Sequence, residues 1–86
     1  MTQVLFKPTF VRSYKKLSVE LREEVKEKIE MFKIDTSSPS LKVHKFKGKM
    51  KDFYSFSVNY RYRIVFSYKS KNLVTFLNIG DHDVYK

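Results

Sequence analysis

The stretch Asn59-Tyr60-Arg61-Tyr62-Arg63-Ile64-Val65-Phe66-Ser67-Tyr68 alternates between two kinds of side chain. Such alternation predicts a β-strand whose two faces meet different surroundings. One face is expected to pack in the core, and it carries Tyr60, Tyr62, Ile64, Phe66 and Tyr68. The other face carries Arg61, Arg63, Val65 and Ser67. It sets two guanidinium groups about 7 Å apart. They are either two solvated charges or a functional cationic site, and the lysine run before the strand favours the second interpretation.

Composition narrows the classes of partner and chemistry. The 86 residues predict one small domain spanning 1–86. The net charge of +9 predicts a polyanionic partner, with nucleic acid ranked before an acidic protein and a membrane third. The chain has no cysteine and two histidines, which argues against a structural metal, and no cofactor is expected. Without a signal peptide or a spanning apolar segment, a soluble cytoplasmic protein with no membrane partner is expected.

The order of elements predicts an α+β fold. Residues 2–6 are expected to form a strand, Pro8 begins a helix, and Ser18 caps a second helix, so the two helices form a hairpin. Strands follow over 53–58, 59–68 and 73–79, with Gly80 predicted to turn the chain off the last one. The order β-α-α-β-β-β indicates a hairpin packed on one face of a small, mainly antiparallel sheet. The other face is expected to stay open and to carry the arginines.

A lysine-rich segment precedes these later strands. Residues 41–51 contain no acid and five lysines, which we predict to bind nucleic acid together with Arg61: Lys42, Lys45, Lys47, Lys49 and Lys51. A solvated surface run is the alternative. Negative charge is concentrated elsewhere, because residues 18–34 carry four basic and five acidic side chains, a net charge of −1.

The remaining residues suit cleavage of RNA by its own 2′-hydroxyl. That reaction needs a base for the hydroxyl proton, an acid for the leaving oxygen and cations for the phosphate, and it needs no metal or protein nucleophile. Histidine suits either proton transfer, arginine matches the phosphate oxygens, and tyrosine can stack on a base or donate a proton. The candidate catalytic residues are Arg63, His82, His44 and Tyr85.

Three segments together resemble the RelE/ParE superfamily of toxins from bacterial type II toxin–antitoxin pairs. They are Leu41-Lys42-x-His44-Lys45-Phe46-Lys47-Gly48-Lys49, Tyr62-Arg63-Ile64-Val65-Phe66 and Ile79-Gly80-Asp81-His82-Asp83-Val84-Tyr85. The resemblance implies a RelE-like fold and a ribosome-dependent mRNA interferase, an endoribonuclease that inhibits translation. It also implies a cognate acidic antitoxin as partner.

The resemblance also implies roles for single residues. Arg63 matches the strand arginine that binds the scissile phosphate, His82 a C-terminal catalytic histidine, and Tyr85 an aromatic residue against the substrate. His44 resembles the first histidine of the YafQ-like pattern, and the lysine run would contact ribosomal RNA. No glutamate follows Glu30, so the strand glutamate of YoeB-like members has no counterpart, and His44 and His82 are both candidates for the general base.

Two other functions stay open from the sequence. A toxin resembling ParE would inhibit DNA gyrase by binding, without catalysis. A basic RNA-binding module without activity is the third interpretation.

Overall fold

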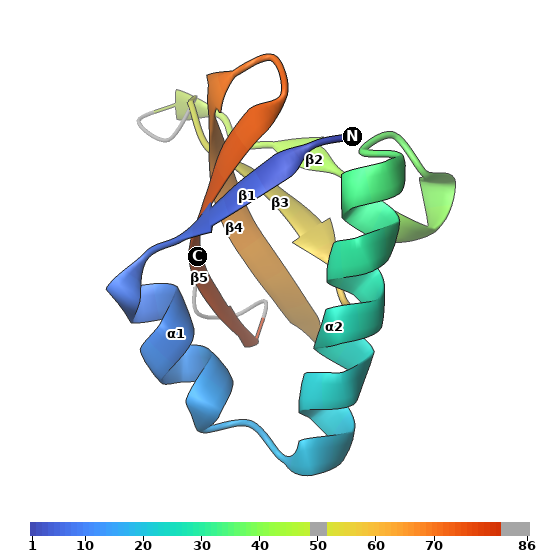
Figure 1. Ribbon diagram of the computed structural model, residues 1–86, viewed down its shortest axis with the longest axis vertical. Coiled ribbons are helices and arrows are strands. Elements are labelled where there is room, and N and C mark those ends of the chain that lie inside the picture. Colours follow the sequence, from blue (N-terminus) through green and yellow to red (C-terminus); the bar gives the residue numbers. More distant parts are fainter. Residues whose placement is uncertain (49–51, 82–86) are drawn as a thin grey trace.

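The computed structural model of the protein describes residues 1–48 and 52–81 (Figure 1). Its helices are α1 (Pro8–Lys15), α2 (Val19–Ile34) and a short 3₁₀ turn, η1 (Pro39–Leu41). Its strands are β1 (Gln3–Phe6), β2 (His44–Lys45), β3 (Tyr54–Ser57), β4 (Tyr62–Ser70) and β5 (Leu73–Asp81). Neither helix is long and apolar enough to cross a lipid bilayer in the part of the chain described.

The strands form one mixed sheet in the order β1-β5-β4-β3-β2. β1 runs parallel to β5, and the other neighbouring pairs are antiparallel. The α+β class, the helical hairpin and the mainly antiparallel sheet are therefore confirmed. The two-residue strand β2 lies inside the lysine run and was not predicted, because its pairing with β3 is too short to leave a periodic pattern.

Both helices begin where the sequence predicts. Pro8 occupies the first turn of α1, where its missing N–H costs no hydrogen bond. Ser18 caps α2, and its hydroxyl accepts from the Leu21 N–H at 3.2 Å. The polar segment after Ile34 ends α2, and Asp35 there accepts hydrogen bonds from the Ser37 N–H at 3.0 Å and the Ser37 hydroxyl at 2.7 Å. Those hydrogen bonds lower the pKa of Asp35.

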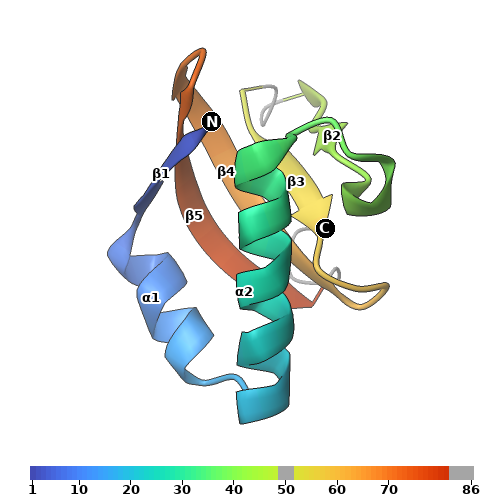
Figure 2. The same cartoon turned by 45° about the vertical axis from the view of Figure 1, so that its right-hand side comes forward.

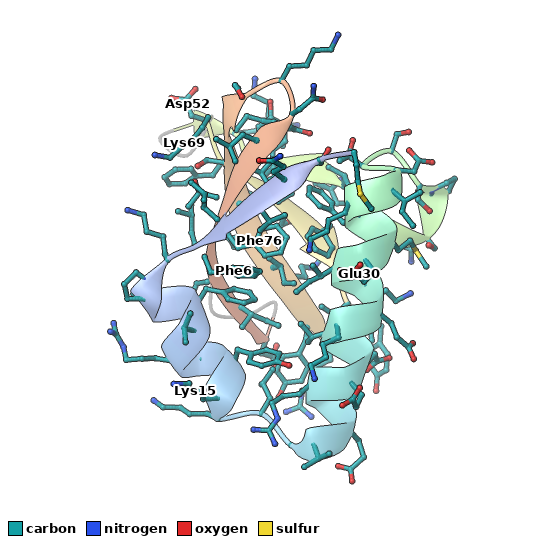
Figure 3. The ribbon with its side chains drawn as sticks, in the orientation of Figure 1. Phe6, Lys15, Glu30, Asp52, Lys69 and Phe76 are labelled. Carbon is teal, nitrogen blue, oxygen red and sulfur yellow. The ribbon has the colours of Figure 1, made fainter. Side chains whose placement is uncertain are left out.

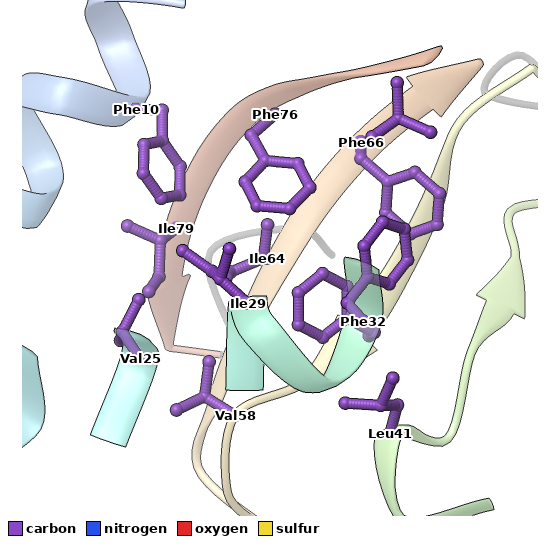
Figure 4. Close-up of a cluster of buried hydrophobic side chains, with 12 residues drawn as sticks. Phe10, Val25, Ile29, Phe32, Leu41, Val58, Ile64, Phe66, Phe76 and Ile79 are labelled. Carbon is purple, nitrogen blue, oxygen red and sulfur yellow. The ribbon is translucent and has the colours of Figure 1, made fainter. Parts of the chain in front are cut away.

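The core lies between the helices and one face of the sheet (Figures 2 and 4). Phe32 of α2 is fully buried at its centre, with ring centroids 4.7 Å from Phe56 and 4.9 Å from Phe66. Phe10 of α1 reaches the same layer and lies 5.5 Å from Phe76. These contacts place both helices on one side of the sheet, and the large aromatic rings fill much of the core between them.

Two details of the predicted strands are wrong. Tyr60 does not face the core; it is 92% exposed, because β4 begins only at Tyr62 and residues 59–61 form a turn. The Asn59 side chain holds that turn by accepting from two backbone N–H groups, which competes with strand pairing. Gly80 does not end the last strand either. It continues in β5 opposite Arg63.

The face of the sheet away from the helices is less open than predicted. Arg63 and Val65 do lie on that face, since Ile64 and Phe66 between and beside them point into the core. However, Val65 is only 3% exposed, and its neighbour Ser55 on β3 is 1% exposed. Small side chains on adjacent strands thus let the sheet bury part of this face.

Candidate nucleic-acid interface

The residues that flank Arg63 in the sheet have a small side chain or none. The register pairs it with Ser57 on β3 and with Gly80 on β5, which carries no side chain. Its Nε atom is buried and has no hydrogen-bond partner among residues 1–48 and 52–81. A buried donor without a partner costs on the order of 1–3 kcal/mol of folding free energy. In proteins such groups therefore usually bind a ligand or a water. The arginine is therefore poised to bind an anion.

A cavity of 380 Å³ opens beside Arg63. It is lined by Ser40, Lys42, Ser57, Asn59, Tyr60 and Arg63. Two of these side chains are cations and the others are neutral polar groups, with no carboxylate among the described lining residues. This combination of positive charge, hydroxyls and an amide suits a phosphate ester, and the tyrosine adds an aromatic surface.

Lys42 reaches the cavity from a strained backbone position. It follows the 3₁₀ turn η1 with a φ of 50°, in the left-handed region that side chains other than glycine rarely adopt. Its N–H donates to the Pro39 carbonyl at 3.2 Å, which fixes this conformation. Strain of this kind is concentrated at functional sites. Of the predicted lysines described, this is the one that lines the cavity with Arg63.

His44 lies on the same face of the sheet as Arg63. It pairs with Ser55 on β3, two residues from the Ser57 that pairs with Arg63. Strand spacing then puts the Cα atoms of His44 and Arg63 about 12 Å apart, a gap that two long side chains and a bound phosphate can span. The His44 side chain is exposed.

Lys45 and Lys47, the other predicted lysines in the part of the chain described, do not line this cavity. Lys45 lies on the opposite face, with its ammonium 5.9 Å from the centre of the Tyr54 ring, and Lys47 is exposed. The positions of Lys49, Lys51, His82 and Tyr85 fall outside the described residues.

The two arginines of the opening stretch have different surroundings. Arg61 Nε lies 3.0 Å from Asp81 Oδ2, and its guanidinium stands 5.7 Å from the centre of the Tyr62 ring. The hydrogen bond to the Asp81 carboxylate raises the pKa of Arg61. Arg61 is thus engaged with β5, whereas Arg63 faces the cavity.

Sequence reasoning missed four lining residues as members of a site: Ser40, Ser57, Asn59 and Tyr60. An Asn between two strand patterns is a typical turn residue, and that signal could have moved the start of β4 past Tyr60. Serine on a strand gives no comparable signal. Within the described ranges, no group of three side chains that could hold a metal ion was found.

A second, apolar cavity of 460 Å³ lies between the two helices. Phe6, Phe10, Val11 and Tyr14 line it from β1 and α1, while Lys26, Ile29, Glu30 and Lys33 line it from α2. Figure 3 shows Phe6 at the sheet side of the helical hairpin and Glu30 on α2. Phe6 is 48% exposed, although its ring centroid lies 5.4 Å from that of Phe10. This cavity, which we call the helical groove, therefore leaves apolar surface in water.

Solved structures of small toxins share the fold over almost the whole chain. The YoeB/ParE toxin from Agrobacterium tumefaciens has a TM-score of 0.77 at 15% identity, covering 94% of this chain and 99% of that chain. YafQ from E. coli strain BL21(DE3) has a TM-score of 0.78 at 12% identity, covering 99% and 98%. A chain of the YoeB–YefM toxin–antitoxin heterotetramer from Staphylococcus aureus has a TM-score of 0.75 at 17% identity, covering 95% and 98%. At these identities the likeness establishes the fold alone.

The family follows from the sequence itself. No curated protein sequence is similar enough to this chain to count as a match. A family model described as the RelE-like toxin of the type II toxin–antitoxin system HigB matches residues 10–82. That range contains α2, most of α1 and the whole lining of the cavity at Arg63. The resemblance to RelE-type toxins is confirmed, and the chain belongs to the HigB-like family of RelE-like toxins from type II toxin–antitoxin systems.

Proposed function

We propose that this toxin is a ribosome-dependent endoribonuclease that cleaves messenger RNA by attack of the RNA's own 2′-hydroxyl, without a metal ion. The observation that carries the proposal is the buried Nε of Arg63, which has no hydrogen-bond partner within residues 1–48 and 52–81 and lies beside a cavity with a second cation, Lys42. Membership of the RelE-like toxins supports the same activity.

The reaction assigns Arg63 to the scissile phosphate. A base takes the proton of the 2′-hydroxyl, O2′ bonds to phosphorus, the P–O5′ bond breaks, and an acid protonates O5′. The products are a 2′,3′-cyclic phosphate and a 5′-hydroxyl. Arg63 and Lys42 neutralise the charge that develops on the phosphate oxygens, which is the step that a preorganised cationic site accelerates most.

His44 and His82 are the two candidates for the proton transfers. His44 shares the face of Arg63, so it can serve a substrate bound at the cavity. His82 follows Asp81, the end of β5, directly in the chain, and Tyr85 comes three residues later. Both positions follow the strand that carries Gly80 next to Arg63, and the resemblance gives them a catalytic and a substrate-contacting role.

The remaining cations provide the contact with the ribosome in this proposal. Lys45 and Lys47 are exposed at or near β2, Arg61 is exposed just before β4, and Lys49 and Lys51 add two further positive charges in the same stretch of sequence. Positive charge of this density binds the phosphates of ribosomal RNA with little regard for sequence. The site of action is then the cytoplasm, where translated messages are found.

Primer extension on translated messages after induction of the protein tests the proposal. We expect new breaks for the wild type and none for Arg63→Ala, while Arg12→Ala on the exposed side of α1 serves as the matched control and cleaves normally. His82→Ala and His44→Ala then show which histidine is needed. Growth arrest without breaks, equally strong in Arg63→Ala, would instead indicate a binding toxin such as a gyrase inhibitor. Normal growth on strong expression would indicate a module without activity.

We infer that a cognate antitoxin holds this toxin inactive. The family is defined by toxin–antitoxin systems, and one structural neighbour was solved as a complex of the toxin YoeB with YefM. The helical groove supports a docking place, because its apolar lining and exposed Phe6 fit the apolar face of an amphipathic helix. The net charge of +9 favours an acidic partner.

A further inference from the structure

Tyr60 is the most exposed of the large apolar side chains in the described part of the chain. It is 92% exposed, compared with 48% for Phe6 and 41% for Tyr68. An isolated exposed aromatic residue needs no explanation by itself. Two further features set this one apart: the rigidity of its turn and the cavity beside it.

The turn that carries Tyr60 is fixed on both sides. Asn59 Oδ1 accepts from the Arg61 N–H at 2.9 Å and from the Tyr62 N–H at 2.8 Å. The Val58 N–H donates to the Tyr62 carbonyl at 2.9 Å and closes the turn below. Asn59 Nδ2 also donates to Glu24 on α2 at 2.8 Å, which anchors the turn to the helix layer. An aromatic ring on such a turn is presented without the entropy cost of ordering a loop.

The ring of Tyr60 is left available next to the phosphate site. Tyr60 lines the same cavity as Arg63. Its neighbour Arg61, which could have covered it, is held by Asp81 and by the Tyr62 ring instead. Within residues 1–48 and 52–81, no ring contact or hydrogen bond engages the Tyr60 side chain.

We propose that Tyr60 is a nucleobase-binding site, where the base next to the phosphate bound by Arg63 stacks on the exposed phenol ring. This inference rests on the proposed cleavage of RNA and adds the group that holds the substrate. Stacking accepts every base, because each has an aromatic face, so Tyr60 positions the strand and does not select its sequence. The ring, and not the hydroxyl, carries the effect.

Binding of an uncleavable single strand tests this site. The probe is a fluorescent 2′-O-methyl RNA hexamer, which lacks the attacking hydroxyl, and its abasic ribose-phosphate counterpart is the control. We expect Tyr60→Leu to weaken hexamer binding about 5- to 150-fold, the contribution of stacking one base on an aromatic ring. Tyr60→Phe should bind like the wild type, and Tyr60→Leu should leave binding of the abasic strand unchanged.

Two outcomes overturn the proposal. One is equal binding of the hexamer by wild type and Tyr60→Leu, and the other is a wild type that does not prefer the hexamer over the abasic strand. Thermal unfolding of each variant checks folding, which a side chain so exposed should not affect. If the proposed function is wrong, the wild type will not cleave messages. If only the stacking role of Tyr60 is wrong, the wild type will still cleave messages and Arg63→Ala will still abolish cleavage.

Discussion

The amide of Asn59 donates to the carboxylate of Glu24 across 2.8 Å and so ties the turn before β4 to the N-terminal half of α2. The same side chain accepts two backbone hydrogen bonds within the turn. One residue therefore sets both the start of the central strand and the wall of the cavity at Arg63.

Removal of the Asn59 side chain should loosen this wall. We expect Asn59→Ala to lower the free energy of unfolding by about 1–2 kcal/mol, because it leaves partly buried donors and acceptors unpaired. Glu24→Gln keeps an oxygen that accepts from Asn59, so it should cost less. Urea unfolding of the wild type and both variants measures these losses. Variants as stable as the wild type would show that the tie to α2 contributes little.

The arginine fork at position 63 should not be replaceable by a simple positive charge. Arg63→Lys keeps the charge but loses the planar set of donors that matches two phosphate oxygens. We expect message cleavage to fall about 10- to 100-fold, equivalent to one charged hydrogen bond. Arg12→Lys is the matched control and should cleave like the wild type. Full activity of Arg63→Lys would mean that only the charge matters.

Lys42 should trade stability for binding. Lys42→Gly relieves the left-handed backbone, whose φ is 50°, so we expect the free energy of unfolding to rise by up to about 1 kcal/mol. Cleavage should nevertheless fall, since one cation leaves the cavity. Lys42→Ala removes the same charge and keeps the strain, so it should lose activity without gaining stability. A stable and fully active Lys42→Gly would contradict the role of the charge.

Phe32 should be among the most costly side chains to truncate. It is fully buried and touches the rings of Phe56, Phe66 and Phe76. We expect Phe32→Ala to reduce the free energy of unfolding by about 3–5 kcal/mol. Phe32→Leu keeps most of the volume and should cost clearly less. Chemical denaturation followed by circular dichroism measures both, and a loss below 1 kcal/mol for Phe32→Ala would mean that the core repacks.

The helical groove should be the docking place of the antitoxin. Val11→Asp puts a carboxylate into its apolar lining, and we expect binding of the cognate antitoxin to weaken at least about tenfold. Val19→Asp, at the exposed start of α2, is the matched control and should bind normally. Calorimetric titration gives both affinities. Equal affinities would place the antitoxin on another surface.

The sequence predicts the elements well where one physical signal dominates. Pro8 and Ser18 start the helices as expected, since each supplies a local cap that packing does not override. The alternation after Tyr62 fixes the faces of β4, so the side of Arg63 is predictable. Tyr60 is misplaced because the alternating pattern continues into residues that form a turn. That turn is set by the hydrogen bonds of the Asn59 side chain. Gly80 is misplaced because a glycine permits a turn but does not require one.

The cavity could be predicted only in part. Arg63 and Lys42 are visible in the sequence as cations, but their meeting depends on the pairing of β3 with β4 and on the conformation after η1. Lys45 and Arg63 lie on opposite faces of the sheet because of the register of the two-residue strand β2, which pairs Lys45 with Tyr54. Ser57 joins the site through the same pairing of β3 with β4, and Asn59 through the turn between these two strands. Long-range contacts of this kind leave no periodic mark in the sequence.

The order of the strands also has a consequence in time. Arg63 acquires both of its neighbours only when Ser57 and Gly80 are in place, and β1 has its partner only once β5 exists. In a chain still being synthesised, β1 and Arg63 therefore lack their partner strand β5 until residues 73–81 have been made. The neighbours of Arg63 in the sheet are therefore complete only after β5 has been synthesised.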